Sequence, residues 1–188
     1  MQIVQLTVFQ ASPPARRAGR EHAHWPLDLL PAHRGPHRRN ARVSRYAPVI
    51  RLPDQLRELI DSAPLAHLTT INADGSPQVT VIWIGLDSDE PVSGHMRHHL
   101  KLRNIERDPR VVLSFAAPRA PGVFLNPYSV LHARATVEPS DHAWDLLNRL
   151  TKTYVAPDVE YPAPRGPGYI VRYTIERIGG VGPWARPR

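Results

Sequence analysis

Apolar and polar side chains alternate along residues 130–137, where the apolar positions are Leu131, Ala133, Ala135 and Val137. A period of two predicts a β-strand with one buried face. Apolar and β-branched runs predict five further strands at residues 65–71, 78–86, 91–96, 110–116 and 169–178. Turn residues at 72–76 and 87–90 separate the first three strands, so we expect residues 65–86 to form a hairpin.

Helical spacing appears in three other places. Leu52, Leu56, Leu59 and Ile60 recur around Pro53, which suits a first helical position. Residues 99–107 predict a second helix, which ends before Asp108-Pro109. Ser140 is a suitable cap for a third helix that extends to about residue 154. Its expected inner face carries Trp144, Leu147, Leu150 and Tyr154.

The order of these elements indicates the fold class. Tight turns join the early strands, and no regular alternation of strand and helix predicts a parallel sheet. We therefore expect a mainly β (α+β) domain, a six-stranded antiparallel barrel that is closed or partly split and carries a few peripheral helices.

The net charge of +7 is concentrated at one end of the chain. Residues 1–46 contain eight arginines and two acidic residues, which leaves a net charge of only +1 for the remainder. This segment is rich in Arg, His and Pro and has Trp25 as its sole tryptophan. A basic arm for nucleic acid is one interpretation. We favour a disordered extension, followed by one domain over residues 47–188, and expect no nucleic-acid partner.

Composition excludes several kinds of site. The chain has no cysteine, so it has no disulfide, thiolate metal site or cysteine nucleophile. It also has no run of about 20 apolar residues and no export signal pattern. We expect a soluble cytoplasmic protein without a membrane partner.

The densest polar cluster spans residues 94–104, where a predicted strand is followed by a predicted helix. Arg97 and Lys101 are four positions apart and become neighbours if the helix begins early. A helix N-terminus with cationic side chains can bind an anion, and phosphate is the natural ligand. A solvated basic face balanced by Glu106 and Asp108 explains the same pattern, and spacing alone does not choose between the two.

Other chemistries have weaker support. His95, His98 and His99 could suggest a metal, but adjacent histidines diverge on a helix and no nearby carboxylate completes a ligand set. We expect no metal site. No serine lies in a G-x-S-x-G elbow, and the glycine-rich segments lack the strand and long helix of a dinucleotide fingerprint. No catalytic residue can be assigned.

Two motifs together resemble a known family. The first is the hairpin at residues 65–83, and the second is Lys-x-Arg-Asn-Ile-x-x-Asp-Pro-Arg at residues 101–110. From about residue 56 to residue 184, the sequence resembles the pyridoxamine 5'-phosphate oxidase-like split β-barrel flavoproteins. It is most similar to their actinobacterial branch, which uses the deazaflavin coenzyme F420.

The resemblance implies cofactor-binding residues. Lys101 matches the position that contacts the cofactor phosphate, and His99 stands where relatives often have Arg, so Arg97 or Arg103 would supply the second contact. His95 and Met96 match positions beside the ribityl chain, and Trp184 matches a C-terminal region that approaches the pocket. The segment expected to line the ring consists of Thr80, Val81, Ile82 and Trp83.

The resemblance also implies an activity and an assembly. It implies an F420-dependent oxidoreductase that transfers a hydride between the cofactor and a small unsaturated organic substrate. It implies a homodimer with cofactor at the subunit interface. The alternatives are an FMN-dependent oxidase or reductase on the same fold, or a flavin-binding or deazaflavin-binding protein without turnover. Pyridoxamine phosphate oxidation is not expected, because the arginine-rich substrate-binding C-terminus is missing.

Overall fold

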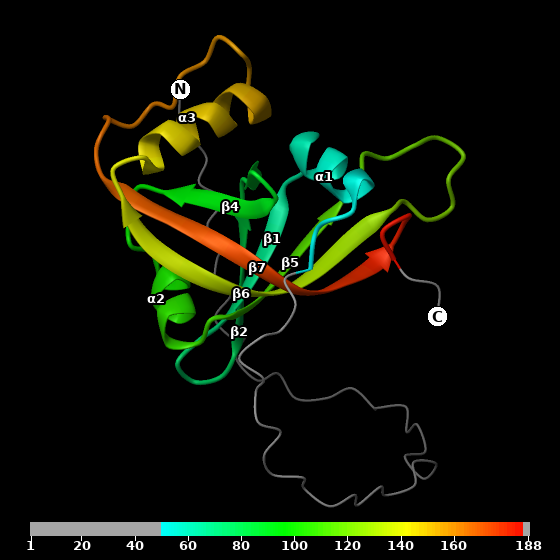
Figure 1. Cartoon of the computed structure of the whole chain (residues 1–188), viewed down its shortest axis with the longest axis horizontal. Helices are drawn as coiled ribbons and strands as arrows, with labels where there is room; N and C mark the ends of the chain where they lie inside the picture. The colour runs from blue at the N-terminus through cyan, green and yellow to red at the C-terminus, as the bar shows by residue number, and fades with distance from the viewer. Residues whose placement is uncertain (1–49, 186–188) are drawn as a thin grey trace, which may run out of the picture. The chain divides into compact units, whose positions relative to one another are not determined.

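A computed structural model describes residues 50–185 of the chain. These residues form a seven-stranded antiparallel sheet in the order β2-β1-β5-β6-β7-β4-β3, with three helices around it (Figure 1). The elements are α1 (Asp54–Asp61), β1 (Ala66–Ile71), β2 (Pro77–Ile82), β3 (Gly85–Asp87), β4 (Glu90–His95), α2 (Leu100–Arg107), β5 (Arg110–Ala116), β6 (Tyr128–Ser140), α3 (Ala143–Tyr154) and β7 (Gly168–Val181). The α+β antiparallel fold is confirmed. The predicted extension at residues 1–46 lies outside the described residues.

The strand count is seven and not six, because the strand expected at residues 78–86 is divided into β2 and β3. The Tyr154 hydroxyl accepts a hydrogen bond from the backbone nitrogen of Ile84 at 3.1 Å and lies 2.9 Å from its carbonyl oxygen. The backbone groups of Ile84 are thus paired outside the sheet. A β-branched run cannot reveal this break, since Tyr154 lies 70 positions away.

The same break explains how the sheet closes. β2 and β3 are the two edges of the sheet, yet only Trp83 and Ile84 separate them in the chain. Three Cα–Cα steps join Ile82 to Gly85, which limits their separation to about 11 Å. The sheet must therefore curl until its edges nearly meet. β2 and β3 are not hydrogen-bonded to each other in the sheet, so the barrel is closed at this point by the chain segment that joins them.

The longest pair in the sheet is formed by β6 and β7. Their register extends from Tyr128↔Val181 to Ser140↔Gly168, with a bulge next to His132. β7 begins one residue earlier and ends three residues later than predicted, and it includes Gly179 and Gly180. A Cβ on Gly180 would lie 2.1 Å from the Tyr128 carbonyl oxygen, so only glycine permits this close pairing.

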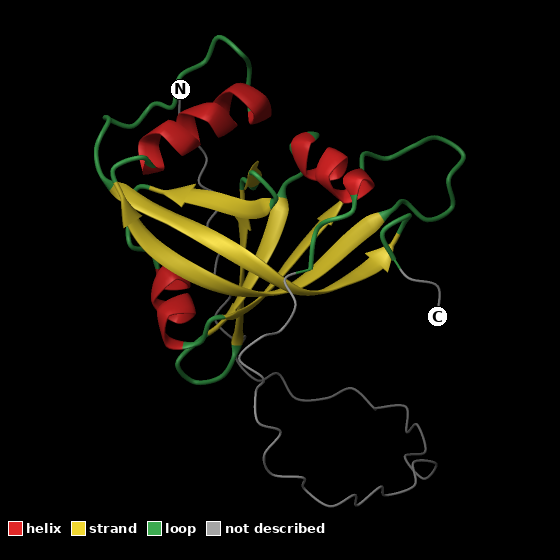
Figure 2. Ribbon diagram, viewed as in Figure 1, coloured by secondary structure: helices red, strands yellow, loops and turns green. Residues whose placement is uncertain are grey.

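The core fills the interior of the curled sheet. Inward residues alternate along β5, where Val111, Leu113 and Phe115 are buried. α1 and α2 bury apolar side chains in this cluster, whereas α3 packs over β4 in a second cluster (Figure 2). None of the helices in residues 50–185 has the length and apolar character needed to cross a membrane.

Candidate cofactor site at the start of helix α2

A buried amide fixes α2 against the β1–β2 hairpin. Asn104 is fully buried, and its Nδ2 lies 2.9 Å from Asn72 Oδ1, 2.9 Å from Gln78 Oε1 and 3.1 Å from Thr70 Oγ1. Its Oδ1 accepts a hydrogen bond from Arg107 at 3.2 Å. The Lys-x-Arg-Asn motif therefore contains a structural residue, and Asn104 determines where the start of α2 lies.

The start of α2 is an uncompensated positive end. No side chain caps it, and its first turn contains no acidic residue, whereas α1 and α3 have Asp54 and Asp145 in theirs. The backbone N–H groups of Leu100 and Lys101 have no backbone acceptor among the described residues. Free N–H groups and the helix dipole both favour a bound anion here.

Four predicted basic residues lie at or near this end, namely Arg97, His99, Lys101 and Arg103. Lys101 is half-buried, and no described residue pairs with its ammonium group. Burial lowers the pKa of Lys101. His99 is the N-cap residue, and burial followed by Lys101, Arg97 and Arg103 lowers its pKa. Positive charge is thus concentrated where no described carboxylate neutralises it.

Arg103 and Arg97 differ in their contacts. The Arg103 guanidinium donates to the carbonyl oxygen of His98 at 3.2 Å, so it is partly engaged. Arg97 is exposed, and no ion pair joins it to any described residue. Of the two candidates for a second phosphate contact, Arg97 is the one whose donors are free.

His95 and Met96 lie where β4 ends, just before this cluster. His95 is 7% exposed, and its Nε2 lies 2.9 Å from the Oγ of Ser93. Burial lowers the pKa of His95 to about 3, with Lys101 the next largest cause. Met96 is half-buried. Gly168 allows β7 to begin against this turn, because a Cβ there would lie 2.5 Å from the His95 carbonyl oxygen.

His98 is directed away from the cluster. Its Nε2 lies 2.9 Å from Glu106 Oε1, and its ring is 5.0 Å from the ring of Tyr169. No group of three His, Cys, Asp or Glu side chains able to hold a metal occurs within residues 50–185.

The four predicted residues from Thr80 to Trp83 do not share one face. Thr80 and Ile82 point into the barrel, opposite Leu68 and Ala66 of β1, and Val81 points outward. The Thr80 Oγ1 is fully enclosed and has no hydrogen-bond partner among the described residues. Trp83 leaves the strand and stacks on a tyrosine of α3.

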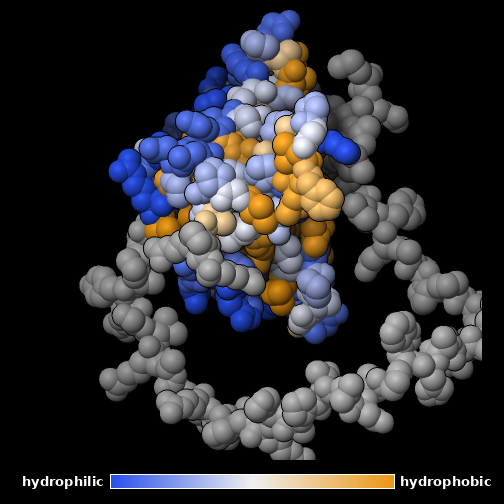
Figure 3. Space-filling view, turned by 90° about the vertical axis from the view of Figure 1, so that its right-hand side faces the viewer, coloured by the Kyte–Doolittle hydropathy of each residue, from blue (hydrophilic) through white to orange (hydrophobic). Residues whose placement is uncertain are grey.

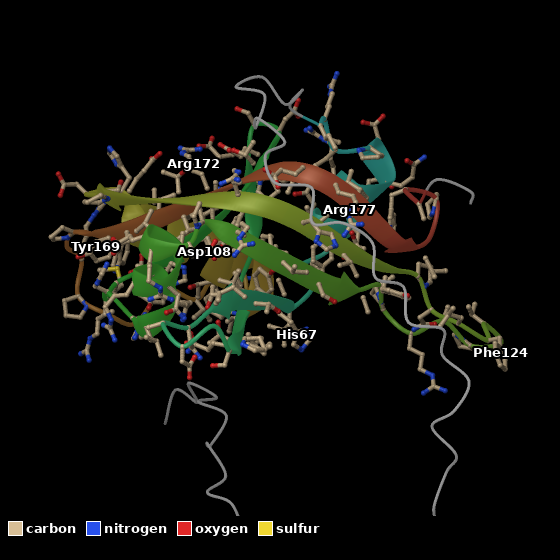
Figure 4. All side chains as sticks on the ribbon, turned by 90° about the horizontal axis from the view of Figure 1, so that it is seen from below. His67, Asp108, Phe124, Tyr169, Arg172 and Arg177 are labelled. Carbon is tan, nitrogen blue, oxygen red and sulfur yellow. The ribbon has the colours of Figure 1, made fainter. Side chains whose placement is uncertain are left out.

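The outer face of the β1–β2 hairpin contains the predicted Val81 together with residues that the sequence interpretation missed. Val79 is 53% exposed and Val81 is 40% exposed. His67 lies opposite Val81 in the register and is labelled on this face in Figure 4. Thr69 lies opposite Val79. The alternation along residues 77–82 contains the necessary signal, because it assigns Val79 and Val81 to the face opposite Thr80.

Trp184 is remote from the α2 cluster within one chain. It is buried in the core, and its indole nitrogen donates to the Tyr128 carbonyl oxygen at 3.1 Å. His95 of β4 pairs with Tyr169, which lies at the start of β7. Trp184 lies beyond the other end of β7. In Figure 4, Tyr169 and Phe124 of the β5–β6 loop lie at opposite ends of this long pair.

A cavity of about 570 Å³ lies elsewhere in the described residues. It is lined by the β3–β4 turn and by β7, including Asp87, Glu90 and Arg172. Arg172 pairs with Asp87 at 2.8 Å, with Glu90 at 3.4 Å and with Glu138 at 3.3 Å. Its charge is therefore compensated, and none of the α2 residues lines this cavity.

Comparison with known proteins agrees with this architecture. The family described as pyridoxamine 5'-phosphate oxidase matches residues 52–182. A solved structure titled F420 reductase superposes with a TM-score of 0.57 and 24% identity, covering 68% of this chain and 98% of that chain. A conserved hypothetical protein from Mycobacterium tuberculosis gives a TM-score of 0.58 and 18% identity, covering 73% and 88%.

A heme binding protein from Mycobacterium smegmatis gives a TM-score of 0.54 and 22% identity, covering 73% of this chain and 57% of that chain. No curated protein matches the sequence. The structural likenesses lie below 25% identity and so concern the fold. The family match spans most of the described residues, from two residues before α1 to the residue after β7. The chain belongs to the pyridoxamine 5'-phosphate oxidase-like family of flavin and deazaflavin proteins.

Proposed function

We propose that this protein is an oxidoreductase that binds coenzyme F420 and transfers a hydride between it and a small unsaturated organic substrate. FMN is the alternative cofactor on the same fold. The supporting observation is the uncapped start of α2, where the ammonium group of Lys101 has no described partner. This end suits the phosphate that both cofactors carry, so it does not discriminate between them.

The residues at this end have separate tasks. Lys101 and the free backbone N–H groups of the first turn would hold the phosphate by charge-assisted hydrogen bonds. Arg97 is the second cation with free donors. Asn104 keeps the turn in place from behind by its bonds to Asn72 and Gln78. The phosphate contact would thereby fix the position of the ring relative to the barrel.

A second subunit has a natural place on the outer face of the β1–β2 hairpin. The exposed Val79 and Val81 form an apolar surface beside His67, and covering such a surface removes it from water. Figure 3 shows a different face, the one on the right in Figure 1, and orange hydrophobic side chains lie between polar ones there as well. A homodimer would bring a remote residue such as Trp184 of one subunit closer to the cofactor of the other.

The bound cofactor would supply the hydride chemistry, and the protein would supply binding, orientation and exclusion of water. The apolar Val79 and Val81 would lie against the ring and keep water from it. None of this requires a catalytic triad, which agrees with the lack of a nucleophile motif in the sequence.

The test is a pair of titrations of the purified full-length chain, one with coenzyme F420 and one with FMN, each followed by fluorescence to saturation. Saturable F420 binding at micromolar or lower concentration, tighter than FMN binding, supports the proposal. Reduced F420 is then mixed with a panel of enones and quinones, and its loss is followed by absorbance. Preference for FMN would replace the proposed cofactor, and binding without turnover would replace the proposed enzyme by a binding protein.

A further inference from the structure

Three buried side chains form a hydrogen-bonded line from the barrel interior to the start of α2. Tyr173 and Ser93 are fully buried, and the Tyr173 hydroxyl lies 2.8 Å from Ser93 Oγ. Ser93 Oγ in turn lies 2.9 Å from Nε2 of His95. Ser93 and His95 are two positions apart in β4, so both face the interior.

The hydrogens on this line can be placed by counting donors and acceptors. Ser93 is the one hydrogen-bond partner that the Tyr173 hydroxyl has among the described residues. Tyr173 must donate to Ser93, because the reverse direction would leave a buried hydroxyl hydrogen without an acceptor. The single hydroxyl hydrogen of Ser93 then points to His95 Nε2, which accepts it.

This assignment determines the tautomer of His95. A neutral imidazole has one N–H, and Nε2 is already an acceptor, so the hydrogen is on Nδ1. The low pKa of His95 keeps the ring neutral near pH 7. Both ring nitrogens are thus assigned: the Nε2 lone pair accepts from Ser93, and Nδ1 carries the hydrogen.

The Nδ1 atom remains without an acceptor in residues 50–185. The His95 side chain is 7% exposed, so it is not fully enclosed. After burial, Lys101 and His99 are the charged groups that lower the pKa of His95. The donors without a described acceptor at this point are Nδ1–H, the Lys101 ammonium and the backbone N–H groups of Leu100 and Lys101.

We propose that Tyr173 and Ser93 hold His95 as a neutral Nδ1–H donor, which binds an anionic oxygen at the start of α2 and cannot ligate a haem iron. The identification of that oxygen with a cofactor phosphate rests on the proposed function, but the tautomer and the preference for oxygen do not. The haem exclusion is specific to this chain's donor arrangement, since a histidine ligates iron through a free lone pair.

The tautomer is tested without any ligand. Long-range ¹H–¹⁵N spectra of ¹⁵N-labelled full-length protein distinguish a protonated ring nitrogen from an unprotonated one, and His95→Asn assigns the signal. We expect protonated Nδ1 and unprotonated Nε2 at pH 7. Ser93→Ala should release the constraint and give a mixture of tautomers, and Tyr173→Phe should shift the population in the same direction. A wild-type His95 protonated at Nε2 would overturn the assignment.

The oxygen site is tested with inorganic phosphate as the probe. His95→Asn retains an N–H donor in place of Nδ1, whereas His95→Leu removes it at similar size. We expect phosphate affinity to fall about tenfold or more in His95→Leu and to be largely retained in His95→Asn. Thermal unfolding checks that both variants fold. Equal affinity in all three proteins, or no phosphate binding to the wild type, would overturn the donor role.

Titration with haem completes the test. We expect the absorption spectrum of added haem to show no ligation that depends on His95. A spectral change present in the wild type and lost in His95→Leu would overturn the inference. A third outcome separates the two proposals. If phosphate binding depends on His95 but the protein binds neither F420 nor FMN, the proposed function is refuted and the donor role of His95 is retained.

Discussion

The indole of Trp83 is stacked on the ring of Tyr154, with ring centroids 5.3 Å apart and planes inclined by 16°. The hydroxyl of the same tyrosine lies 2.8 Å from the Pro64 carbonyl oxygen and binds both backbone groups of Ile84. One side chain of α3 thus holds Pro64, two residues before β1, and the link between β2 and β3. The Tyr154 hydroxyl thus supplies hydrogen bonds between β2 and β3, where the two sheet edges do not pair with each other.

Removal of that hydroxyl should weaken the barrel. In Tyr154→Phe the Ile84 N–H loses its partner, and we expect the free energy of unfolding to fall by about 1–3 kcal/mol. Urea denaturation measures the change. Tyr161→Phe is the control, because no described residue hydrogen-bonds to that hydroxyl, and its effect should stay below about 0.5 kcal/mol. Equal losses in both variants would contradict the role of Tyr154.

The amide that anchors α2 should be more critical. Asn104→Ala leaves the buried polar groups of Thr70 and Gln78 with fewer partners, and we expect a loss of about 2–4 kcal/mol in unfolding free energy. Asn126→Ala is the control, since its side chain makes one long contact of 3.5 Å in a loop. It should cost less than about 1 kcal/mol. A small effect at Asn104 would mean that water replaces the lost bonds.

The cationic residue at the start of α2 should control cofactor affinity. Lys101→Ala removes a charge-assisted contact, and we expect the binding free energy to weaken by about 1–3 kcal/mol. Fluorescence titration measures this with whichever cofactor binds. Lys152→Ala is the matched control, because Lys152 is the other lysine of the chain and occupies an exposed position of α3, and it should leave affinity unchanged. Unchanged affinity in Lys101→Ala would place the phosphate elsewhere.

Stability should depend on pH through His95. Its pKa is about 3 when folded, against an ordinary value of 6.5, so only the unfolded chain binds this proton between those values. The free energy of unfolding should therefore fall as pH decreases from 6.5 towards 3, by up to about 1.4 kcal/mol per pH unit.

Urea denaturation between pH 7 and pH 4 tests this against His95→Asn. Burial lowers the pKa values of His99 and His132 as well, and both contribute with the same sign in both proteins. Their shared contribution cancels in the difference, and the variant should show the shallower slope. The hydrogen bond from Arg110 lowers the pKa of Asp108 to about 2, so that group loses its contribution below this range. Parallel curves would remove His95 as the cause.

The proposed dimer surface predicts a change in assembly. Val79→Glu puts a charge on the outer face of the β1–β2 hairpin, and we expect dissociation to monomers together with weaker cofactor binding. Sedimentation equilibrium measures the mass. Val155→Glu is the control, as Val155 is 57% exposed against 53% for Val79 but lies after α3. Dissociation in both variants, or in neither, would refute this choice of surface.

Much of the fold could be predicted from local pattern. Period-two alternation correctly predicted that residues 130–137 form a strand, which is part of β6. The turn residues between β1 and β2 identified the hairpin. Helical spacing identified α2 and α3 to within about three residues. What failed was non-local: the break after Ile82 depends on Tyr154, and the last residues of β7 depend on how closely Tyr128 can approach Gly180.

The candidate site shows the same division. The cationic start of α2 is readable from the spacing of Arg97 and Lys101, because both charges and the helix boundary are local features. The uncapped character of that end, the burial of His95 and its link to Tyr173 are not readable, since they depend on a strand that lies about 80 positions away. The sequence interpretation also assigned both Thr80 and Val81 to the lining of the cofactor ring, although their side chains are on opposite faces of β2.

The position of β7 has a consequence for biosynthesis. β7 lies between β6 and β4. Val92 of β4 pairs with Arg172 of β7, which is translated 80 residues later. A nascent chain that has completed α3 therefore exposes one unpaired edge on each of two strands, the kind of surface that chaperones protect. The barrel closes only when β7 has left the ribosome. Premature termination anywhere before that strand would cost the cell the whole domain and leave an aggregation-prone fragment.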